Sequence, residues 1–323
     1  ITTRLVGSEM CIRDRFNISS LKDVLGDMTL TNLLIEELDL SQINFNGNTL
    51  TLQCKQLNKI VGSETFNGSL FLLPKDCRLT EFTLEGISNI QGDFQCIDYF
   101  YVKEFVMPFI RVAGDMTIAL NSGSVNTAAE IEFPKLQEIG GTLTLGTNRN
   151  ANNITFPLLK KILGSCSVTT YKLKNDIEFT NLESIGTDGA DAQIKFEIEA
   201  TNILCPKLKT INGKFDIATS SFMFDMEVDK VSYPNVESIS ENLSITCPYS
   251  DFGSNGILSI DFSGLKSVKG ISISGQGDVT DFSSFKYLFE NNVLTGESQW
   301  SVRECAYNPT YQDMKDGKYK LAE

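Results

Sequence analysis

Apolar and polar residues alternate along this chain in many short runs. Leu143 to Leu145 and Phe215 to Ile217 are typical, because each places one polar residue between two apolar residues. Since successive side chains of a strand point to opposite faces, each run predicts a short strand with one buried face. The pattern therefore predicts a mainly β protein.

These runs belong to a phrase that recurs along the chain. The phrase consists of an aromatic residue, proline, any residue, leucine, any two residues and isoleucine, followed closely by glycine and an alternating strand. Clear copies begin at Phe133 and Phe156. Further copies begin at Phe179, Cys205, Tyr233 and Phe262, and weaker ones begin at Cys54, Leu84 and Met107. From Leu84 onward, successive starts are 23, 26, 23, 23, 26, 28 and 29 residues apart, which is the range of solenoid repeats.

Proline marks one position within the repeat. Five of the eight prolines occupy the same slot of the phrase, namely Pro108, Pro134, Pro157, Pro206 and Pro234. Proline fixes φ and lacks an N–H donor, so it suits the end of a strand. Each copy predicts two strands, one after the glycine and one before the aromatic residue. A tight turn or short helical bend is expected between them, as from Leu136 to Ile139.

A single repeat buries too few side chains to offset the conformational entropy lost by its ordered backbone. Stacking the repeats completes their backbone hydrogen bonds and buries both faces of each coil. The sequence thus predicts a right-handed parallel β-solenoid with coils of 23 to 29 residues.

Both ends of the chain depart from the repeat. Asp281 to Glu290 carries aromatic and leucine residues typical of a broad apolar helix face, and another short helix is predicted from near Thr310 to Gly317. Leu21 to Asp39 is also expected to include a short helix. The expected organisation is an N-terminal cap with a first irregular coil at 16–53, the solenoid at 54–280, and short capping helices and a tail at 281–323.

The first fifteen residues have a different origin. Leu5 to Asp14 read LVGSEMCIRD and resemble the in-frame translation of a transposase sequencing adapter, and Ile1 to Arg4 fall where its variable index bases would be translated. Residues 1–15 are therefore expected not to be native protein. On this interpretation the native N-terminus, with any signal peptide or lipid-modified cysteine, lies upstream of the sequence.

Composition excludes several classes of function. Without residues 1–15 the chain has 25 basic and 39 acidic side chains, so nucleic acid is not an expected partner. It has no run of eighteen apolar residues, so no membrane span is expected. Histidine is absent, which disfavours serine and cysteine triads, the common zinc sites and imidazole acid/base catalysis. Carboxylate or lysine chemistry stays open, and no cofactor is expected.

Two features carry a resemblance to known proteins. The repeated phrase, over about Cys54 to Ile273, is similar to that of leucine-rich and receptor L-type solenoids. The segment Trp300 to Lys320, WSVRECAYNPTYQDMKDGKYK, resembles the closing motif of surface leucine-rich-repeat lipoproteins from Bacteroidales. The resemblance implies export to the bacterial surface, a lipid anchor at the upstream N-terminus, and contact with host or glycan. The spread of coil lengths departs from the family and puts a regular concave face in doubt.

Aromatic residues concentrate in two of the longer connections between phrases. These are Tyr99, Phe100, Tyr101 and Phe105 in one connection, and Phe222 and Phe224 in another. Exposed rings can stack on sugars or anchor a protein interface. Packing in the core or at an edge is the alternative for each ring.

Acidic residues suggest a second kind of site. Asp188 and Asp191 lie in an insertion rich in glycine and aspartate, where loop oxygens can coordinate calcium, although no EF-hand or RTX-type spacing is present. A second acidic group, Asp225, Glu227 and Asp229, alternates along one predicted strand face. A solvated surface is the ordinary explanation for both groups.

The cysteines are expected to be core residues. Cys54 and Cys205 stand in the aromatic slot, and Cys96 and Cys166 stand in strand slots, so each replaces a core hydrophobe. A disulfide that joins Cys77 to a neighbour stays open.

The leading functional hypothesis is a non-catalytic cell-surface binding or adhesion protein. It would be a monomer that presents a solenoid flank to a glycan or to a host or extracellular protein. One alternative is a β-helix polysaccharide lyase or hydrolase, in which two carboxyl groups about 5 to 10 Å apart flank a cleft. Asp225 with Asp229, or Asp188 with Asp191, are the candidate pairs. The other alternative is a structural spacer.

Overall fold

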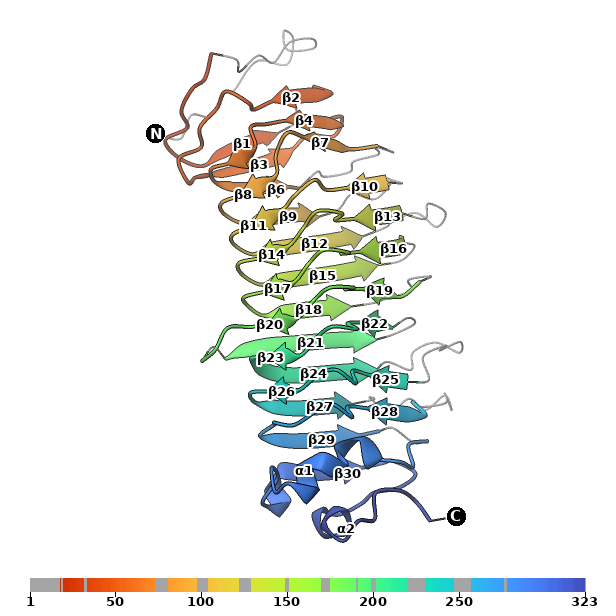
Figure 1. Cartoon of the computed structure of the whole chain (residues 1–323). Helices are drawn as coiled ribbons and strands as arrows, with labels where there is room; N and C mark the ends of the chain where they lie inside the picture. The colour runs from red at the N-terminus through yellow and green to blue at the C-terminus, as the bar shows by residue number, and fades with distance from the viewer. Residues whose placement is uncertain are drawn as a thin grey trace. The chain divides into compact units, whose positions relative to one another are not determined.

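The computed structural model describes most of the chain after its first seventeen residues. The described residues are 18, 20–31, 34–73, 81–97, 104–121, 129–148, 151–169, 175–189, 191–198, 202–219, 230–246, 257–275 and 278–322. The adapter-like residues 1–15 lie outside this set. The chain divides into two compact units, Ile1–Leu159 and Lys160–Glu323. Parallel strands stack coil upon coil within each unit, so the predicted parallel β-solenoid is confirmed (Figure 1).

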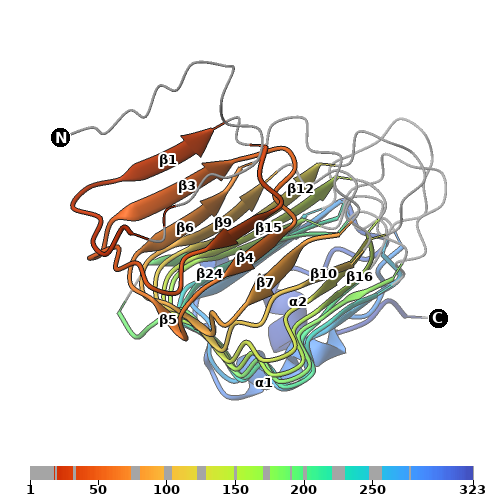
Figure 2. The same cartoon turned by 90° about the horizontal axis from the view of Figure 1, so that it is seen from above.

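The wide sheet of unit 1 provides one side of each coil. Its strands follow the order β1 (Met28–Thr31), β3 (Thr49–Gln53), β6 (Ser69–Leu72), β9 (Phe94–Ile97), β12 (Met116–Asn121) and β15 (Leu143–Asn148). All neighbours are parallel and in register, so that Leu70 pairs with Leu50 on one side and with Phe94 on the other. Figure 2 shows these strands side by side. The glycine-following strands of the repeat are therefore confirmed as one continuous surface within unit 1.

Two further sides complete the coils of unit 1. A narrow sheet contains β5 (Thr65–Phe66), β8 (Asn89–Ile90), β11 (Arg111–Val112) and β14 (Glu138–Ile139). The third side contains β2 (Glu37–Asp39), β4 (Lys59–Val61) and β7 (Thr83–Glu85), and then β10 (Glu104–Val106), β13 (Ala129–Glu132) and β16 (Ala151–Thr155). The sequence predicted two strands and a bend in each coil, but the end of that bend is a third strand. The strands of the narrow sheet are two residues long and form only through pairing between coils. They are too short to show an alternation of apolar and polar residues in the sequence.

Unit 2 repeats this arrangement. Its wide sheet contains β18 (Cys166–Thr169), β21 (Ala192–Ile198), β24 (Gly213–Thr219), β27 (Asn242–Thr246), β29 (Gly270–Ser274) and β30 (Trp300–Arg303). Its narrow sheet contains β17 (Lys161–Ile162), β20 (Ser184–Ile185), β23 (Thr210–Ile211) and β26 (Ser238–Ile239). The third side is formed by the pairs β19 (Ile177–Glu178) with β22 (Ile203–Leu204), and β25 (Lys230–Ser232) with β28 (Ser259–Asp261).

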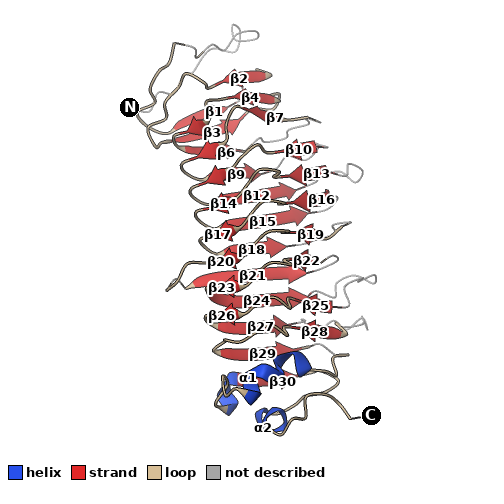
Figure 3. Cartoon of the chain, in the orientation of Figure 1, coloured by secondary structure: helices blue, strands red, loops and turns tan. Residues whose placement is uncertain are grey.

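Helices in the described residues occur only near the C-terminus (Figure 3). They are η1 (Ser283–Phe285), α1 (Lys286–Glu290), η2 (Glu297–Gln299) and α2 (Tyr311–Lys315). The two predicted C-terminal helices are thus confirmed, although both are short. The helix expected within Leu21 to Asp39 is wrong, because the described residues of that segment form β1 and β2. Met28 to Thr31 pairs in register with β3, and this pairing between coils outweighs the local preference.

The aromatic slot of the phrase forms the centre of the core. In unit 1 the rings of Phe133 and Phe156 are buried and stack in parallel, with their centroids 4.8 Å apart. In one coil of unit 2 the slot is occupied by Cys205, which is smaller than a ring. Phe215 from the wide sheet lies 5.4 Å from Tyr233, the next slot residue, and 5.2 Å from Phe196. Aromatic rings from the wide sheet therefore occupy the core where the slot residue is small.

The predicted burial of four cysteines is confirmed. Cys54, Cys96, Cys166 and Cys205 all lie in the core. Desolvation raises the pKa of the Cys166 thiol to about 12 and also raises the pKa of Cys205. Both thiols therefore stay protonated at neutral pH and behave as small hydrophobic groups. Cys77 lies outside the described residues, so the proposed disulfide stays a prediction.

Glycine allows the coils of unit 1 to approach closely at one corner. A Cβ atom added to Gly114 would lie 2.8 Å from the carbonyl carbon of Gly92 in the preceding coil. The neighbouring aspartates satisfy backbone donors across the same corner. Asp93 accepts a hydrogen bond from the Asp115 N–H at 2.8 Å, and Asp115 accepts one from the Thr142 N–H at 2.7 Å. The glycine of the phrase is therefore a requirement of stacking.

Charged residues alternate in sign along two columns formed by stacked coils. In unit 1, Lys59 lies 3.9 Å from Glu37 in the preceding coil and 3.2 Å from Glu85 in the following coil. In unit 2 a backbone-linked column runs through Lys160, Glu183, Lys209, Glu237 and Lys266. The Lys266 ammonium lies 2.9 Å from Glu237 and lowers the pKa of that carboxyl group. Like charges in register would repel, so the alternation favours this stacking order.

The aromatic column gives a direct test of the core. Phe133→Ala is expected to lower the free energy of unfolding by about 3 to 5 kcal/mol, because it removes a buried ring and leaves a cavity against Phe156. Urea denaturation followed by circular dichroism measures the change. Phe71→Ala, on the outward side of the wide sheet, is the control and is expected to cost much less. Equal losses in the two variants would contradict this assignment of the core.

Candidate binding surface

Two rows of outward residues run from coil to coil along the wide sheet in unit 1. They lie beside a third row, at the start of the strands, that contains Thr49, Ser69 and the acidic Asp93 and Asp115. The first row contains Thr29, Thr51, Phe71, Gln95, Thr117 and Thr144. The second row contains Thr31, Gln53, Leu73, Ile97, Ala119 and Gly146. Leu73 directly follows β6 and is held beside β3 by a 2.9 Å hydrogen bond from its N–H to the Leu52 carbonyl oxygen. We call these twelve residues the neutral face.

The neutral face is accessible and carries no charge. Each of its twelve residues is exposed or partly exposed, and none is acidic or basic. This composition is unusual in a chain in which 21% of all residues are charged. Surfaces that need only to be solvated are rich in charged side chains. The composition therefore distinguishes this surface from an ordinary solvated one.

The corresponding surface of unit 2 has a different character. On β21, Lys195 pairs with Glu197 at 2.5 Å, and on β24, Lys214 pairs with Asp216 at 2.9 Å. The hydrogen bond from Lys195 lowers the pKa of Glu197. The outward side of a solenoid strand in this protein thus accommodates charge readily. Neutrality is a property of the unit 1 face and is not imposed by the fold.

Polar and apolar groups are separated on the neutral face. In the central coils the second row is apolar, with Leu73, Ile97 and Ala119 in succession. The first row is mostly hydroxyl and amide, with the Phe71 ring between Thr51 and Gln95. Neighbouring strands lie about 4.8 Å apart, and outward residues on one strand lie about 7 Å apart. The face therefore presents an apolar strip beside a line of hydrogen-bonding groups.

Most of the aromatic residues considered as binding positions are not among the described residues. Tyr99, Phe100, Tyr101, Phe222 and Phe224 all lie outside them, so their role stays a prediction. Phe105 is buried in β10, in agreement with the alternative of core packing. The first group begins two residues after Ile97 in the sequence, at the end of a strand that contributes to the neutral face.

The predicted calcium ligands lie on an exposed turn. Asp188 and Asp191 are both exposed and precede β21, and Gly186 and Gly189 shape the turn with φ values of 81° and 76°. Within the described residues, no group of three or more histidine, cysteine, aspartate or glutamate side chains is placed to hold a metal ion. The structure thus supplies no third carboxylate or thiolate ligand there. Asp225, Glu227 and Asp229 lie outside the described residues.

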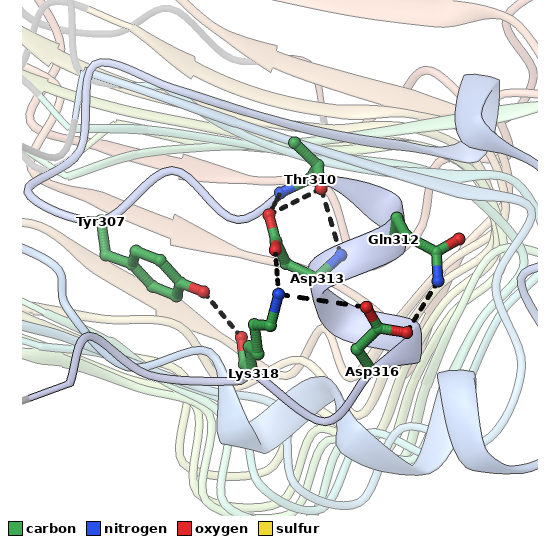
Figure 4. Close-up of polar contacts among 6 residues, drawn as sticks. All are labelled: Tyr307, Thr310, Gln312, Asp313, Asp316 and Lys318. Atoms are coloured by element: carbon green, nitrogen blue, oxygen red, sulfur yellow. Dashed lines mark hydrogen bonds and ion pairs between the residues drawn. The ribbon is translucent and has the colours of Figure 1, made fainter.

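Polar side chains also cluster in the C-terminal tail (Figure 4). Thr310 begins α2, and its hydroxyl oxygen accepts a hydrogen bond from the Asp313 N–H at 3.1 Å. The Asp313 carboxylate accepts hydrogen bonds from the Thr310 N–H and hydroxyl at 3.1 and 2.6 Å. Lys318 pairs with Asp313 at 3.1 Å. The cluster is therefore a helix capping box closed by an ion pair.

The rest of the tail packs as a cap on the aromatic residues of unit 2. Trp300, in β30, donates a hydrogen bond from its indole N–H to the Pro309 carbonyl oxygen at 2.9 Å. Its ring lies 5.1 Å from Phe289 and 5.6 Å from Phe285. Cys305, five residues after Trp300, is also buried. The most distinctive residues of the tail thus have structural roles that require no ligand.

Comparison with protein-family models, curated proteins and solved structures found no match. No helix in the described part of the chain is long and apolar enough to span a membrane.

The capping box gives a prediction for the response to pH. Hydrogen bonds from Thr310, together with Lys318, lower the pKa of Asp313 from 3.8 to about 2. Because the folded-state pKa is the lower one, ionised Asp313 stabilises the cap above about pH 4, and this contribution is lost as pH falls toward about 2. Trp300, the single tryptophan, is expected to report the loss as a fluorescence change in that range.

Asp313→Asn is expected to abolish the change of Trp300 fluorescence between about pH 4 and 2. It is also expected to destabilise the C-terminal cap at neutral pH. Asp316→Asn is the matched control, because Asp316 also contacts Lys318, at 3.9 Å, but lies outside the capping box. The role of Asp313 would be refuted if Asp313→Asn kept this fluorescence change.

Proposed function

We propose that this protein is a non-catalytic binding protein of the cell surface that holds a glycan or an extracellular protein on the neutral face. The observation that carries the proposal is the run of twelve accessible, uncharged residues across six stacked strands, in a chain with a net charge of −13. Such a surface is suited to contact with a partner, because covering it leaves no ionic group without a counter-charge.

The chemistry of the neutral face favours binding over catalysis. Its polar side chains are those of threonine and glutamine, which carry hydroxyl and amide groups. The twelve residues carry no carboxylate, ammonium or thiol group. A hydroxyl group becomes a nucleophile only beside a base, and the twelve residues include none. Threonine, alanine and glycine also lose little side-chain entropy on contact. The face is therefore pre-organised for a ligand that it holds without transforming.

The proposed location rests on the resemblance of the sequence. The repeat between about Cys54 and Ile273 is similar to that of leucine-rich and receptor L-type solenoids, and the tail from Trp300 to Lys320 resembles the closing motif of bacterial surface leucine-rich-repeat lipoproteins. The stacked coils fit that role, because they present a broad contact area instead of a deep pocket.

A charge placed on the neutral face tests the proposal. The wild-type chain is expected to bind at least one glycan on an array or one immobilised matrix protein. Thr117→Lys is expected to weaken that binding by about 10-fold or more, because the long charged side chain would stand in the first row, where the ligand is proposed to lie. Biolayer interferometry measures the affinity.

Ser272→Lys is the matched control, because Ser272 is an outward residue of the wide sheet in unit 2. This variant is expected to bind like the wild type. A wild-type chain that binds nothing, or an equal loss in both variants, would count against the proposal and favour a structural spacer.

A further inference from the structure

We infer that the ligand of the neutral face is an uncharged, linear glycan that lies along the direction in which the coils stack. This inference rests on the proposed function and narrows it. It uses four properties of the face, namely the absence of charge, the chemistry of its polar groups, the chemistry of its apolar groups and its size.

The absence of charge restricts the ligand first. None of the twelve residues can neutralise a carboxylate, sulfate or ammonium group. An anionic ligand would have to desolvate its charged groups without a counter-charge, which is unfavourable. The acidic Asp93 and Asp115 in the adjacent row disfavour it further, so anionic polysaccharides fit this face poorly.

The polar groups match sugar hydroxyls. Threonine hydroxyls and glutamine amides both donate and accept hydrogen bonds, as sugar hydroxyls do. Gln95 and Thr117 lie side by side on β9 and β12, and Thr144 follows on β15. A ligand with regularly spaced hydroxyl groups would meet a hydrogen-bonding side chain about every 4.8 Å along this row.

The apolar groups match the other side of a sugar ring. Pyranose rings carry apolar C–H faces that pack against aromatic and aliphatic side chains. Phe71 supplies an outward, partly exposed ring, and Leu73 and Ile97 extend the apolar surface along the second row. A glycan chain that lies parallel to the rows would place C–H groups on this strip and hydroxyls over the first row.

The size of the face favours a narrow ligand. Six strands span roughly 24 Å, and two rows cover a width of about 13 Å, so the area is about 300 Å². A stable complex between two globular proteins usually buries about 800 Å² on each partner. The neutral face alone is thus too small for a globular partner, whereas it accommodates an extended chain of several sugar units.

Affinity electrophoresis and isothermal titration calorimetry with the full chain test the inference. The neutral probes are hydroxyethyl cellulose, galactomannan and dextran, and the anionic probes are polygalacturonate and chondroitin sulfate. At least one neutral probe is expected to bind, with an affinity that changes little between about 0.05 and 0.5 M NaCl, because no charge pair is involved. Neither anionic probe is expected to bind.

Variants of Phe71 show whether the neutral face is responsible. Phe71→Ala is expected to weaken binding of the neutral probe by about 10-fold, and Phe71→Tyr is expected to retain it. Tyr287→Ala removes an aromatic side chain that is 42% exposed on α1, and it is expected to have no effect. A thermal melt of Phe71→Ala confirms that the variant is folded.

Three results would overturn the inference. They are binding of the anionic probes alone, neutral-probe binding that is unchanged in Phe71→Ala, and failure of all three neutral probes. If a matrix protein then binds and Thr117→Lys weakens it, the proposed function stands and only the glycan assignment fails. If Thr117→Lys weakens the binding of no ligand, the proposed function and the glycan assignment both fail.

Discussion

Hydrogen bonding between successive coils is the interaction on which this fold depends. A strand of two to seven residues cannot satisfy its own backbone groups, so each coil must take its partners from the coils above and below it. In-register parallel pairing then converts every position of the repeat into a column of neighbours about 4.8 Å apart. Columns of rings and glycines are mutually favourable, as for Phe133 with Phe156 and Gly92 with Gly114. The charged column around Lys59 alternates in sign, which avoids repulsion between like charges.

Those features of the fold that recur in the sequence could be predicted from it. The phrase located the aromatic slot, the glycine corner and the alternating strands of the wide sheets, and it identified the buried cysteines as core residues. The two-residue strands such as β14 could not be predicted, because they exist only through pairing between coils. The same pairing made β1 a strand where local preference suggested a helix. Prediction thus succeeded for each coil and was incomplete where neighbouring coils determine the structure.

The candidate site was also predictable within each strand but not across neighbouring coils. The outward position of Phe71 and Gln95 follows from alternation within their strands, but their adjacency requires the register between β6 and β9. The neutral face is therefore visible only after stacking is known. The capping box was accessible earlier, since Thr310 followed by Asp313 is a helix-start signal in the sequence. Most of the aromatic residues considered from the sequence lie outside the described part of the chain, so the neutral face is an independent candidate.

The alternating columns also restrict how such a protein can change its length. In unit 2 the order Lys160, Glu183, Lys209, Glu237 and Lys266 reverses sign at every coil. Gain or loss of one coil would bring two like charges into register at the junction, whereas gain or loss of two coils would preserve the sequence of signs. Along this column, electrostatics therefore favours gain or loss of coils in pairs over gain or loss of single coils.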